Sequence, residues 1–323
     1  MRIDPAVAEV RAAVRIALQQ ALAESRLEAG DLVLAAVSGG VDSLALAAAL
    51  AWVGPKVGVR TGAVTVDHGL QANSAAQAAM AGELCAALGL DPVRIVTAVV
   101  GGTGGPEAAA RNARYDALAG VAARERSSCI ALGHTLDDQA ETVLLGLARG
   151  AGARSLAGMR PLDNGPGTLL LRPLLGVRRA TTRAACAALQ LDAWDDLHNG
   201  DRGYARVRVR LDALPVLETA LGPGVAEALA RTAEMLRADA DALDQWALAA
   251  SSLAISDLTA LPAAIRRRVL RAAAVSAGAT DGALAAVHVA ELDRLVMEWH
   301  GQGPVSLPGG LVAHRRCDRL HFR

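Results

Sequence analysis

The chain has 323 residues, and its 33 basic and 33 acidic side chains leave no formal net charge, so no global positive field points to a nucleic-acid partner. Hydrophobic residues make up 52% of the sequence and aromatic residues only 2%, which argues against an aromatic-rich β-sandwich and favours helices packed through small side chains. Four widely spaced cysteines without a CxxC pair argue against a disulfide framework and a zinc or iron–sulfur site. No apolar stretch reaches the ~20 residues of a membrane helix, so we expect a cytoplasmic protein without a membrane partner.

Strand and helix patterns alternate through the first two-thirds of the chain. Short apolar runs predict buried strands at 32–37, 63–66, 93–96 and 128–132, with a weaker one at 169–171. Helical stretches long enough for crossover connections lie between them, at about 41–52, 74–89, 106–125 and 135–149. The alternation predicts an α/β fold, a Rossmann-like parallel sheet with helices on both faces.

The pattern changes after residue 215. Helical periodicity dominates from about 225 to 300, and the last twenty residues alternate between turn signals and short apolar runs that predict a small strand pair. Gly222-Pro223-Gly224 interrupts the chain between the two patterns. We therefore predict two domains, an α/β domain over 1–217 and a smaller, mainly α-helical domain over 218–323.

Three predicted strands end in polar or glycine clusters. These are Ser38-Gly39-Gly40, Asp67-His68-Gly69 and Gly133-His134. Ligands of open parallel sheets bind outside the carboxyl ends of the strands. Three such clusters at one edge predict a single site.

The first cluster continues as Ser38-Gly39-Gly40-Val41-Asp42-Ser43, between a strand and a helix. Consecutive glycines let backbone N–H groups approach a ligand, and the helix N-terminus adds its dipole, so the loop suits phosphate. The Asp42 carboxylate can hold the Mg²⁺ that accompanies ATP. A plain strand-to-helix turn with a polar cap is the alternative interpretation. The loop matches neither a Walker-type pattern nor Gly-x-Gly-x-x-Gly.

The third cluster opens a predicted helix that carries acidic side chains. His134, Asp138 and Glu141 are spaced i, i+4 and i+7, and Asp137 and Glu141 are spaced i, i+4, so each set shares a helix face. Such a face fits a metal site, an ordinary capped helix or a substrate site. Because the cluster follows a strand end, we favour a substrate site whose carboxylates recognise an ammonium group.

Basic residues form two further patterns. Glu107, Arg111 and Arg114 share a helix face, which is either a salt-bridged structural face or a source of positive charge at the active edge. From Arg149 to Arg210, eleven arginines stand against five aspartates. A charge run is usually a solvated face, so this excess alone is weak support for a nucleic-acid partner.

The Ser-Gly-Gly-x-Asp-Ser loop resembles the signature of the ATP pyrophosphatases, the PP-loop enzymes of the adenine nucleotide alpha hydrolase-like fold. Other blocks resemble the tRNA(Ile)-lysidine synthetases, and the resemblance covers about 31–217. The blocks are Val66-Asp67-His68-Gly69-Leu70, Glu107 with Arg111, Arg114 and Tyr115, Leu132 to Thr142 continuing to Arg149-Gly150, Arg172-Pro173-Leu174-Leu175, and Arg206, Arg208 and Arg210 before Leu214-Pro215.

The resemblance implies a ligase that forms a carbon–nitrogen bond in two steps. ATP, bound with Mg²⁺, would adenylate the C2 oxygen of the wobble cytidine in an isoleucine tRNA with a CAU anticodon and release pyrophosphate. The amine of free lysine would then attack C2 and expel AMP, leaving lysidine. Adenylation explains the need for ATP, because it converts the oxygen of a weakly electrophilic base into part of a leaving group. The base would have to leave the anticodon stack.

The resemblance also implies roles for individual residues. The ATP-binding residues would be Ser38, Gly39, Gly40, Val41, Asp42, Ser43, Asp67 and His68, with Asp42 also the metal ligand. The catalytic residues would be Asp42, Arg111 and His134, and lysine would bind Asp137 and Glu141. The tRNA contacts would be Arg114, Arg149, Arg206, Arg208 and Arg210, with the domain after 217 binding phosphates through arginine. Family members commonly form dimers, so a homodimer is a further expectation.

Some positions depart from the family pattern. Thr135 stands where a second histidine is common, Leu197 and His198 where proline and serine are usual, and Val207 where asparagine is common. The departures near 195–210 weaken the tRNA-contact assignments there and leave the ATP site unaffected.

Two other functions stay open at this point. Another PP-loop ATP pyrophosphatase, a tRNA thiolase or an amide-forming synthetase, would share the first loop, although a thiolase usually carries paired cysteines. A nucleotide-binding module that has lost its chemistry is the other, against which the intact Asp42, Arg111, His134 and Glu141 argue.

Overall fold

The computed structural model describes residues 3–67, 69, 73–98, 106–150, 152–194 and 200–323. The chain divides into two compact units, Met1–Glu234 and Met235–Arg323. Each unit has its own core of buried hydrophobic side chains. The sequence-based division after residue 217 stays a prediction about functional domains.

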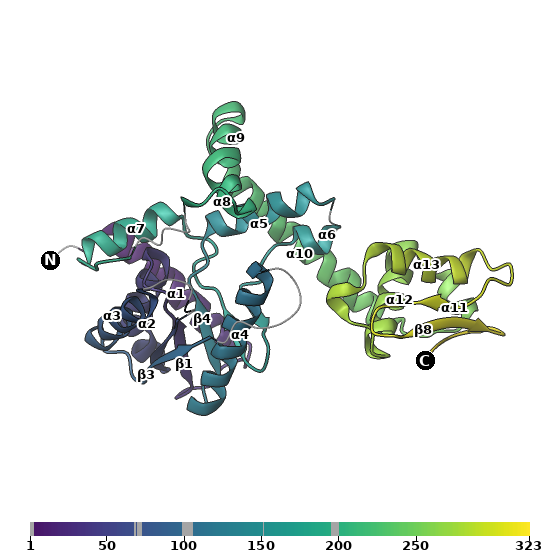
Figure 1. Ribbon diagram of the computed structural model, residues 1–323, viewed down its shortest axis with the longest axis horizontal. Helices are drawn as coiled ribbons and strands as arrows, with labels where there is room; N and C mark the ends of the chain where they lie inside the picture. Colours follow the sequence, from purple (N-terminus) through teal and green to yellow (C-terminus); the bar gives the residue numbers. More distant parts are fainter. Residues whose placement is uncertain (1–2, 68, 70–72, 99–105, 151, 195–199) are drawn as a thin grey trace. The chain divides into compact units, whose positions relative to one another are not determined.

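A six-stranded sheet forms the centre of the first unit (Figure 1). The order of its strands is β3-β2-β1-β4-β6-β5. All neighbouring strands are parallel except β5 and β6. The strands are β1 Leu32–Ala36, β2 Arg60–Asp67, β3 Val93–Thr97, β4 Cys129–Leu132, β5 Leu162–Asn164 and β6 Leu169–Leu171. The predicted parallel sheet is confirmed, and β5 is an edge strand that the sequence analysis missed.

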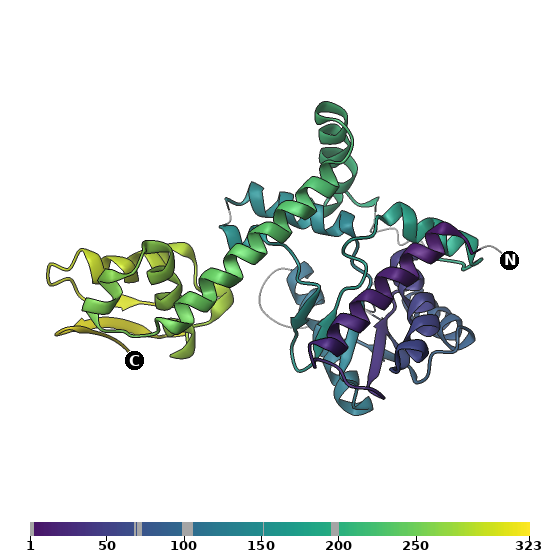
Figure 2. The ribbon, with the colours of Figure 1, turned by 180° about the vertical axis from the view of Figure 1, so that it is seen from behind.

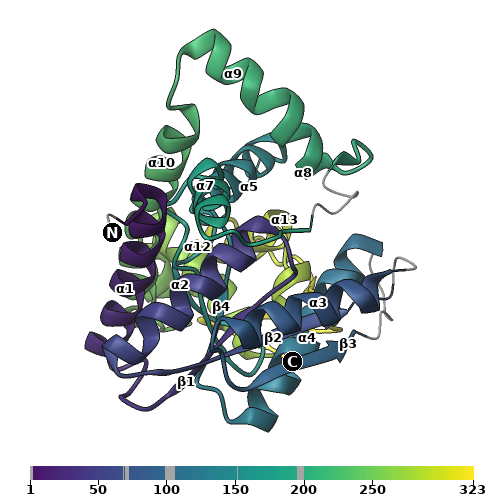
Figure 3. The ribbon, with the colours of Figure 1, turned by 90° about the vertical axis from the view of Figure 1, so that its left-hand side faces the viewer.

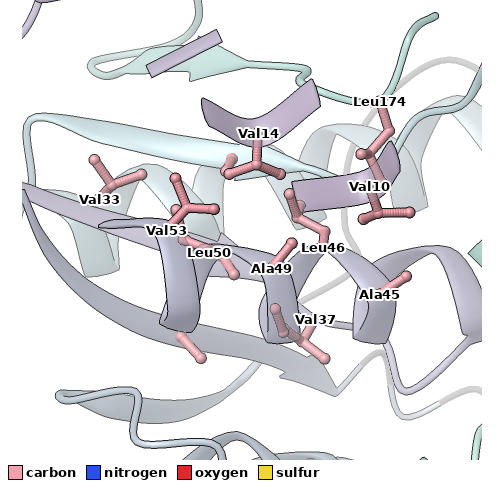
Figure 4. Close-up of a cluster of buried hydrophobic side chains, with 14 of the residues drawn as sticks. Val10, Val14, Val33, Val37, Ala45, Leu46, Ala49, Leu50, Val53 and Leu174 are labelled. Carbon is pink, nitrogen blue, oxygen red and sulfur yellow. The ribbon is translucent and has the colours of Figure 1, made fainter. Parts of the chain in front are cut away.

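Helices cover both faces of this sheet because β1 is apolar at every position. Alternate side chains of a strand point to opposite faces. Val33 packs with α1 (Pro5–Ala23) and α2 (Val41–Val57) on one face, whereas Leu34 packs with α4 (Pro106–Glu125) on the other. Figure 4 shows the first of these two contacts, where Val10 and Val14 of α1 approach α2 and Val33. The expected layering is therefore confirmed, with α1 crossing the sheet in Figure 2 and lying beside α2 in Figure 3.

The helices of the first unit include the four predicted stretches, which form α2 to α5, and several helices that were not predicted. They are α1 Pro5–Ala23, α2 Val41–Val57, α3 Ser74–Ala87, α4 Pro106–Glu125, α5 Leu136–Ala148, α6 Ala153–Leu156, α7 Arg179–Ala188, α8 Ala205–Arg208, a π-helical turn Val209–Ala213 and α9 Leu214–Leu221, followed by α10 Val225–Ala249, which continues into the second unit.

The order of strands creates a switch point between β1 and β4. The chain moves from β1 to β2 and β3 on one side, and β4 and β6 lie on the other. Ligands of open α/β sheets bind where the order reverses. The loops after these strands touch, because a Cβ on Gly133 would lie only 3.1 Å from the backbone of Asp42 and of Ser43. Any larger residue after β4 would have to move the two loops apart by a few tenths of an ångström, so glycine favours this close approach.

The second unit packs helices against a small antiparallel sheet. The elements after α10 are α11 Ile255–Ala260, α12 Ala263–Ser276, a 3-10 helix Asp281–Ala283, α13 Ala286–Met297, and the strands β7 Val305–Ser306, β8 Val312–Arg316 and β9 Arg319–Phe322. The sheet order is β7-β8-β9, one strand more than the expected pair. The core of the second unit includes Leu270, Leu292, Ala313 and Leu320. Across the described part of the chain, no helix is both long and apolar enough to cross a bilayer.

Replacing Gly62 by alanine tests the packing of β2. A Cβ there would lie 2.5 Å from the Pro92 carbonyl oxygen and 2.7 Å from Leu34 Cδ2, so neighbouring backbone must move. We expect Gly62→Ala to lower the free energy of unfolding by about 1–3 kcal/mol in a urea titration. Gly120→Ala is the control, because a Cβ on this exposed α4 position meets nothing within 4 Å. It should raise stability by about 0.5–1 kcal/mol. Equal stability of the two variants would contradict the packing described here.

Candidate active site

The glycine loop lies at the start of α2, at the carboxyl end of β1. Gly40 is the N-cap, and Gly39 adopts a φ of 85°, a left-handed conformation that favours glycine. The Ser43 hydroxyl donates to the Gly40 carbonyl at 2.8 Å and accepts from the Ser38 N–H at 3.2 Å. The Trp194 N–H donates to the Gly39 carbonyl at 3.0 Å. The loop is thus fixed from within, and a glycine cap leaves the helix N-terminus without a competing side chain for an anion.

A cavity of about 230 Å³ opens beside this loop. Gly39, Met80, Leu84, Asp192 and Trp194 are among its lining residues. Its walls come from α3 and from the segment before 195, so an apolar group can lie next to a phosphate on the glycine loop.

Asp42 stands in the first turn of α2 and is held by two residues of α7. Arg179 Nε donates to Oδ2 at 3.1 Å, and the Thr182 hydroxyl donates to Oδ1. Burial raises the pKa of Asp42, while Thr182 and Arg179 act in the opposite direction. The carboxylate is therefore fixed in orientation at the edge of the loop.

The β4–α5 junction is a capping box. Thr135 is the N-cap of α5, and its N–H and hydroxyl donate to Asp138 Oδ2 at 2.8 and 2.9 Å. Although burial raises the pKa of Asp138, the Arg179 charge, the hydrogen bonds of Thr135 and the nearby His134 together lower it. Thr135, a departure from the family pattern, thus has a structural role in starting this helix.

Arg179 joins the two loops through three carboxylates. Besides Asp42, it donates to Asp138 Oδ1 at 2.7 Å through Nη2 and to Glu141 Oε1 at 3.3 Å through Nη1. Glu141 is fully buried and also accepts from Arg210 Nε at 2.7 Å and Nη2 at 3.2 Å. Burial opposes the charge on Arg179, but the surrounding carboxylates raise its pKa. The result is a network of buried ion pairs in which every charge has a partner of opposite sign.

A second cavity, of about 160 Å³, lies beside this network. Its lining mixes carboxylates with arginines and an apolar wall, and comprises Asp137, Glu141, Arg178, Arg179, Arg210, Leu214, Pro215, Glu218 and Ala226. Asp137 accepts from the Arg179 N–H at 2.7 Å and pairs with Arg178 at 3.1 Å. The cavity therefore suits a small molecule that carries both an ammonium and a carboxylate group.

His134 lies between β4 and the start of α5, and its side chain is half-buried. Its Nδ1 is buried and has no hydrogen-bond partner among the described residues. Burial lowers the pKa of His134 to about 3, against the opposing charge of Asp138 and with help from Arg172, Arg114 and Arg111. The imidazole is neutral at pH 7 and can donate or accept one hydrogen bond at each nitrogen.

The predicted arginines divide into two groups. Arg206 lies 3.7 Å from Glu141 and donates to Thr142 at 3.3 Å, so it joins Arg210 in the network. Arg149 is exposed at the end of α5. Arg208 is exposed and donates to backbone carbonyls of 202 and 203. Within the described chain, neither Arg149 nor Arg208 forms a hydrogen bond or an ion pair with the network.

The α4 arginines lie outside the carboxylate network. Arg111 is exposed, donates to Tyr115 Oη at 3.3 Å and places its guanidinium 5.1 Å from the centre of the Tyr115 ring. Arg114 is partly buried, and burial lowers its pKa. Both charges nevertheless act on His134. The α4 face therefore adds positive potential on the His134 side of the site.

The remaining predicted positions lie at its margins. Asp67 ends β2 and accepts from the Gly69 N–H at 2.9 Å. His68, Leu197 and His198 lie outside the described residues. Val207 is buried in α8.

Sequence reasoning missed the residues contributed by the start of α7. Arg179 and Thr182 are 137 and 140 positions from Asp42, so no helical spacing connects them. The only signal is a pair of arginines, Arg178 and Arg179, at the start of a short helix. Among the described residues, no group of three or more histidine, cysteine or carboxylate side chains is arranged to hold a metal ion.

Two families of known domains match this chain. A PP-loop domain family matches residues 11–217, and a family described as the TilS substrate binding domain matches 253–321. Among solved structures, the U34-tRNA thiolase NcsA from Methanococcus maripaludis superposes with a TM-score of 0.60 at 23% identity, covering 72% of this chain and 79% of that one. That likeness shows the fold alone.

Curated relatives match nearly the whole chain. A tRNA(Ile)-lysidine synthase of Streptomyces coelicolor is 54% identical over 305 residues, covering 92% of this chain and 86% of the relative. One from Thermobifida fusca is 54% identical over 324 residues, with 98% and 97% covered. One from Mycobacterium tuberculosis is 48% identical over 334 residues, with the same coverage. The chain, with a PP-loop at its sheet switch point and this identity over nearly its full length, belongs to the tRNA(Ile)-lysidine synthase family.

Proposed function

We propose that this protein uses ATP to join lysine to C2 of the wobble cytidine of an isoleucine tRNA with a CAU anticodon. The observation that carries the proposal is the Arg179 network, which joins the glycine loop to the acidic face of α5 at the switch point of the sheet. An enzyme that activates one substrate with ATP and then adds an amine needs these two parts side by side. In this proposal, residues 1–217 carry the chemistry and 218–323 bind tRNA.

In the first step the loop residues 38–43 bind the phosphates of ATP through backbone N–H groups and the Ser38 and Ser43 hydroxyls. The cytidine O2 attacks the α-phosphorus, and the bond to the pyrophosphate oxygen breaks. Arg111 stabilises the charge on the transferring group from the α4 side. The ion pair with Arg179 fixes Asp42 at the loop. When ATP binds, Asp42 would exchange one of its present contacts for a contact with the metal ion.

Asp42 fits a Mg²⁺ site of the kind that ATP needs. Mg²⁺ is usually held by one or two carboxylates together with substrate phosphates and water, so a cage of three protein ligands is unnecessary. Asp42 is the carboxylate on the loop, and Arg179 supplies the positive charge beside it. Bound there, the ion would neutralise phosphate charge.

In the second step an amine nitrogen of lysine attacks C2, the bond from C2 to the AMP oxygen breaks, and the nitrogen loses a proton. The cavity beside Asp137 and Glu141 presents both signs of charge, as an amino acid requires. Leu214 and Pro215 offer an apolar wall for the methylene chain. Because its pKa is about 3, His134 is a poor proton acceptor. It serves better to orient the cytosine ring through a neutral hydrogen bond than to remove the proton from the amine.

The cysteines argue against a thiolase. Cys85, Cys129 and Cys186 are buried and unpaired, and burial raises the pKa of Cys85 and Cys129 to about 12 and of Cys186 to about 11. Thiolates are the nucleophilic form, so these three side chains are inert. Cys317 is exposed and belongs to the second unit.

A homodimer stays a prediction.

Incorporation of labelled lysine tests the function. We expect label in an isoleucine tRNA transcript with a CAU anticodon when ATP and Mg²⁺ are present, and none in a methionine tRNA with the same anticodon. Asp42→Asn should lower the rate of incorporation by about 10²-fold or more, because the carboxylate charge that would hold Mg²⁺ at the ATP loop is lost. Asp116→Asn, on an exposed position of α4, is the control and should keep full activity. Absence of label with the wild type, together with AMP production on another acceptor, would point to a different PP-loop enzyme.

Arg179→Gln tests the network through stability. The substitution leaves three carboxylates short of one positive charge, so the free energy of unfolding should fall by about 3 kcal/mol or more. Arg94→Gln is the matched control, because its pair with Glu125 is exposed and should contribute only about 0–1 kcal/mol.

The same comparison has a pH signature. Arg179 helps lower the pKa of Asp138 in the folded protein. The stability that this ion pair contributes is therefore fully present above the ordinary carboxyl pKa, and it is lost as the pH falls through the lowered pKa of Asp138. The gap between wild type and Arg179→Gln should therefore narrow on acidification. A gap that stays constant, or a loss no larger than that of Arg94→Gln, would contradict the network's contribution.

His134 gives a second pH prediction of opposite origin. Its pKa is lowered to about 3, so the unfolded chain binds a proton at this position at a higher pH than the folded chain. The wild type should lose stability as pH falls below the ordinary histidine pKa of about 6.5. His134→Gln should remove about 1–2 kcal/mol of the difference between the unfolding free energies at about pH 7.5 and pH 5. His300→Gln, at an exposed position, should leave that difference unchanged.

A further inference from the structure

One face of the second unit's sheet carries four basic or imidazole side chains along β8 and β9, beside Val312 at the start of β8. The strands pair in antiparallel register, with His314 opposite His321 and Arg316 opposite Arg319. Side chains alternate between faces, so these four share one face. The intervening Ala313 and Leu320 are buried in the core on the opposite face.

Arg323 extends this set, because its backbone bonds to that of Val312 in the next pair along the ladder. We call the set the cationic face, which comprises His314, Arg316, Arg319, His321 and Arg323. Figure 1 shows α13 beside β8, and contacts of α13 with β7 and β8 cover the side opposite to this face.

The register places two like charges, those of Arg316 and Arg319, directly opposite each other. Such pairs destabilise a sheet, whereas opposite charges across strands would stabilise it. The two imidazole rings stack with centroids 5.6 Å apart. Burial of part of the ring, then the charges of Arg316, Arg323 and His321, lower the pKa of His314. The repulsion between these side chains lowers the stability of the isolated protein. Binding of an external anion to this face would offset that repulsion.

Helical arginines of this unit form ion pairs with carboxylates of the same chain. Arg266 and Arg267 both bind Asp293, at 2.6 and 2.8 Å, and Arg268 binds Asp244 at 2.8 Å. Arg315, which alternates onto the other face, donates to carbonyls of α13 and lies over Trp299.

By contrast, within the described ranges the guanidinium groups of Arg316, Arg319 and Arg323 have neither an ion pair nor a hydrogen bond. All three side chains are exposed. The unit therefore keeps an unneutralised basic surface on one sheet face while pairing its helical arginines.

We propose that the cationic face binds the sugar–phosphate backbone of the tRNA substrate, an inference that rests on the proposed function. Guanidinium groups bind phosphate through paired hydrogen bonds. Same-face positions repeat at about 7 Å along a strand, and neighbouring strands lie about 5 Å apart, so the face offers two short rows of cations.

The surface reads charge and shape instead of base identity. Sheets that read RNA bases do so with exposed aromatic rings, on which bases stack. The aromatic residue of these strands, Phe322, alternates onto the core face and packs against the hydrophobic cluster. The cationic face therefore positions the tRNA and touches no reacting atom.

The test measures tRNA binding by the full-length protein as a function of salt. Arg316→Gln combined with Arg319→Gln should weaken binding of the tRNA(Ile) transcript by about 10-fold at low salt and reduce the slope of log K against log salt by about 1–2. The weakening should be the same for unrelated tRNAs, since phosphates are common to all. At saturating tRNA the rate of lysine incorporation should stay unchanged, so the KM for tRNA rises while kcat does not.

Two controls match this variant. Arg267→Gln combined with Arg294→Gln removes the same charge from exposed helical positions of the unit and should leave the slope unchanged. Replacing Arg316 and Arg319 by lysine keeps the charge and should restore most of the slope. Thermal unfolding of each variant shows that the second unit is still folded.

The outcomes separate this inference from the proposed function. An unchanged slope and affinity in the double variant would overturn the cationic face, even with an active wild type. Weakening confined to tRNA(Ile), or loss of binding to anionic lipid vesicles in place of tRNA, would also overturn it. If the slope falls as expected but the wild type makes no lysidine, the face stands as an RNA contact and the proposed function fails.

Discussion

The site depends on one guanidinium shared among three carboxylates. Buried ions are tolerated only when each has a close partner, and removing one partner is far more disruptive than replacing the whole set. Asp42 and Asp138 come from the first turns of two helices that follow different strands, Glu141 comes from the second turn of α5, and Arg179 comes from a third helix. One side chain thus sets the relative positions of α2, α5 and α7. The same electrostatic requirement that fixes the fold at this edge also brings the nucleotide loop to the acidic face of α5.

The backbone makes this arrangement possible before any charge is considered. Strands β1 and β4 are neighbours, and the missing side chain of Gly133 allows the loops that follow them to touch. Thr135 and Asp138 then start α5 in a fixed direction. With the helix start rigid, the ion-pair partners meet with little further loss of conformational freedom. An enzyme with two successive steps benefits, because both groups of side chains are already in place when substrates arrive.

Local patterns in the sequence were sufficient for the parallel strands of the sheet and for part of the site. Apolar runs predicted the parallel strands, consecutive glycines predicted the loop, and helical spacing correctly joined Asp138 and Glu141. Spacing also placed Arg111 and Arg114 on one helix face, but the direction of that face depends on how α4 packs, which periodicity does not encode. Arg179 escaped prediction for the same reason: its contact with Asp42 spans 137 positions and exists only in the folded chain. The charge excess around 149–210 was visible, yet which arginines pair internally is decided by tertiary contacts.

The distribution of cysteines makes the protein convenient for spectroscopy. Three thiols are sealed in the interior, whereas Cys317 is exposed on the tight turn between β8 and β9, flanked by Arg316 and the strand that begins at Arg319. A maleimide fluorophore would therefore react selectively at this one natural position. The dye would sit at the rim of the cationic face without any engineered residue, and its emission would change when a polyanion docks there. The native chain thus carries its own attachment point for following substrate arrival in real time.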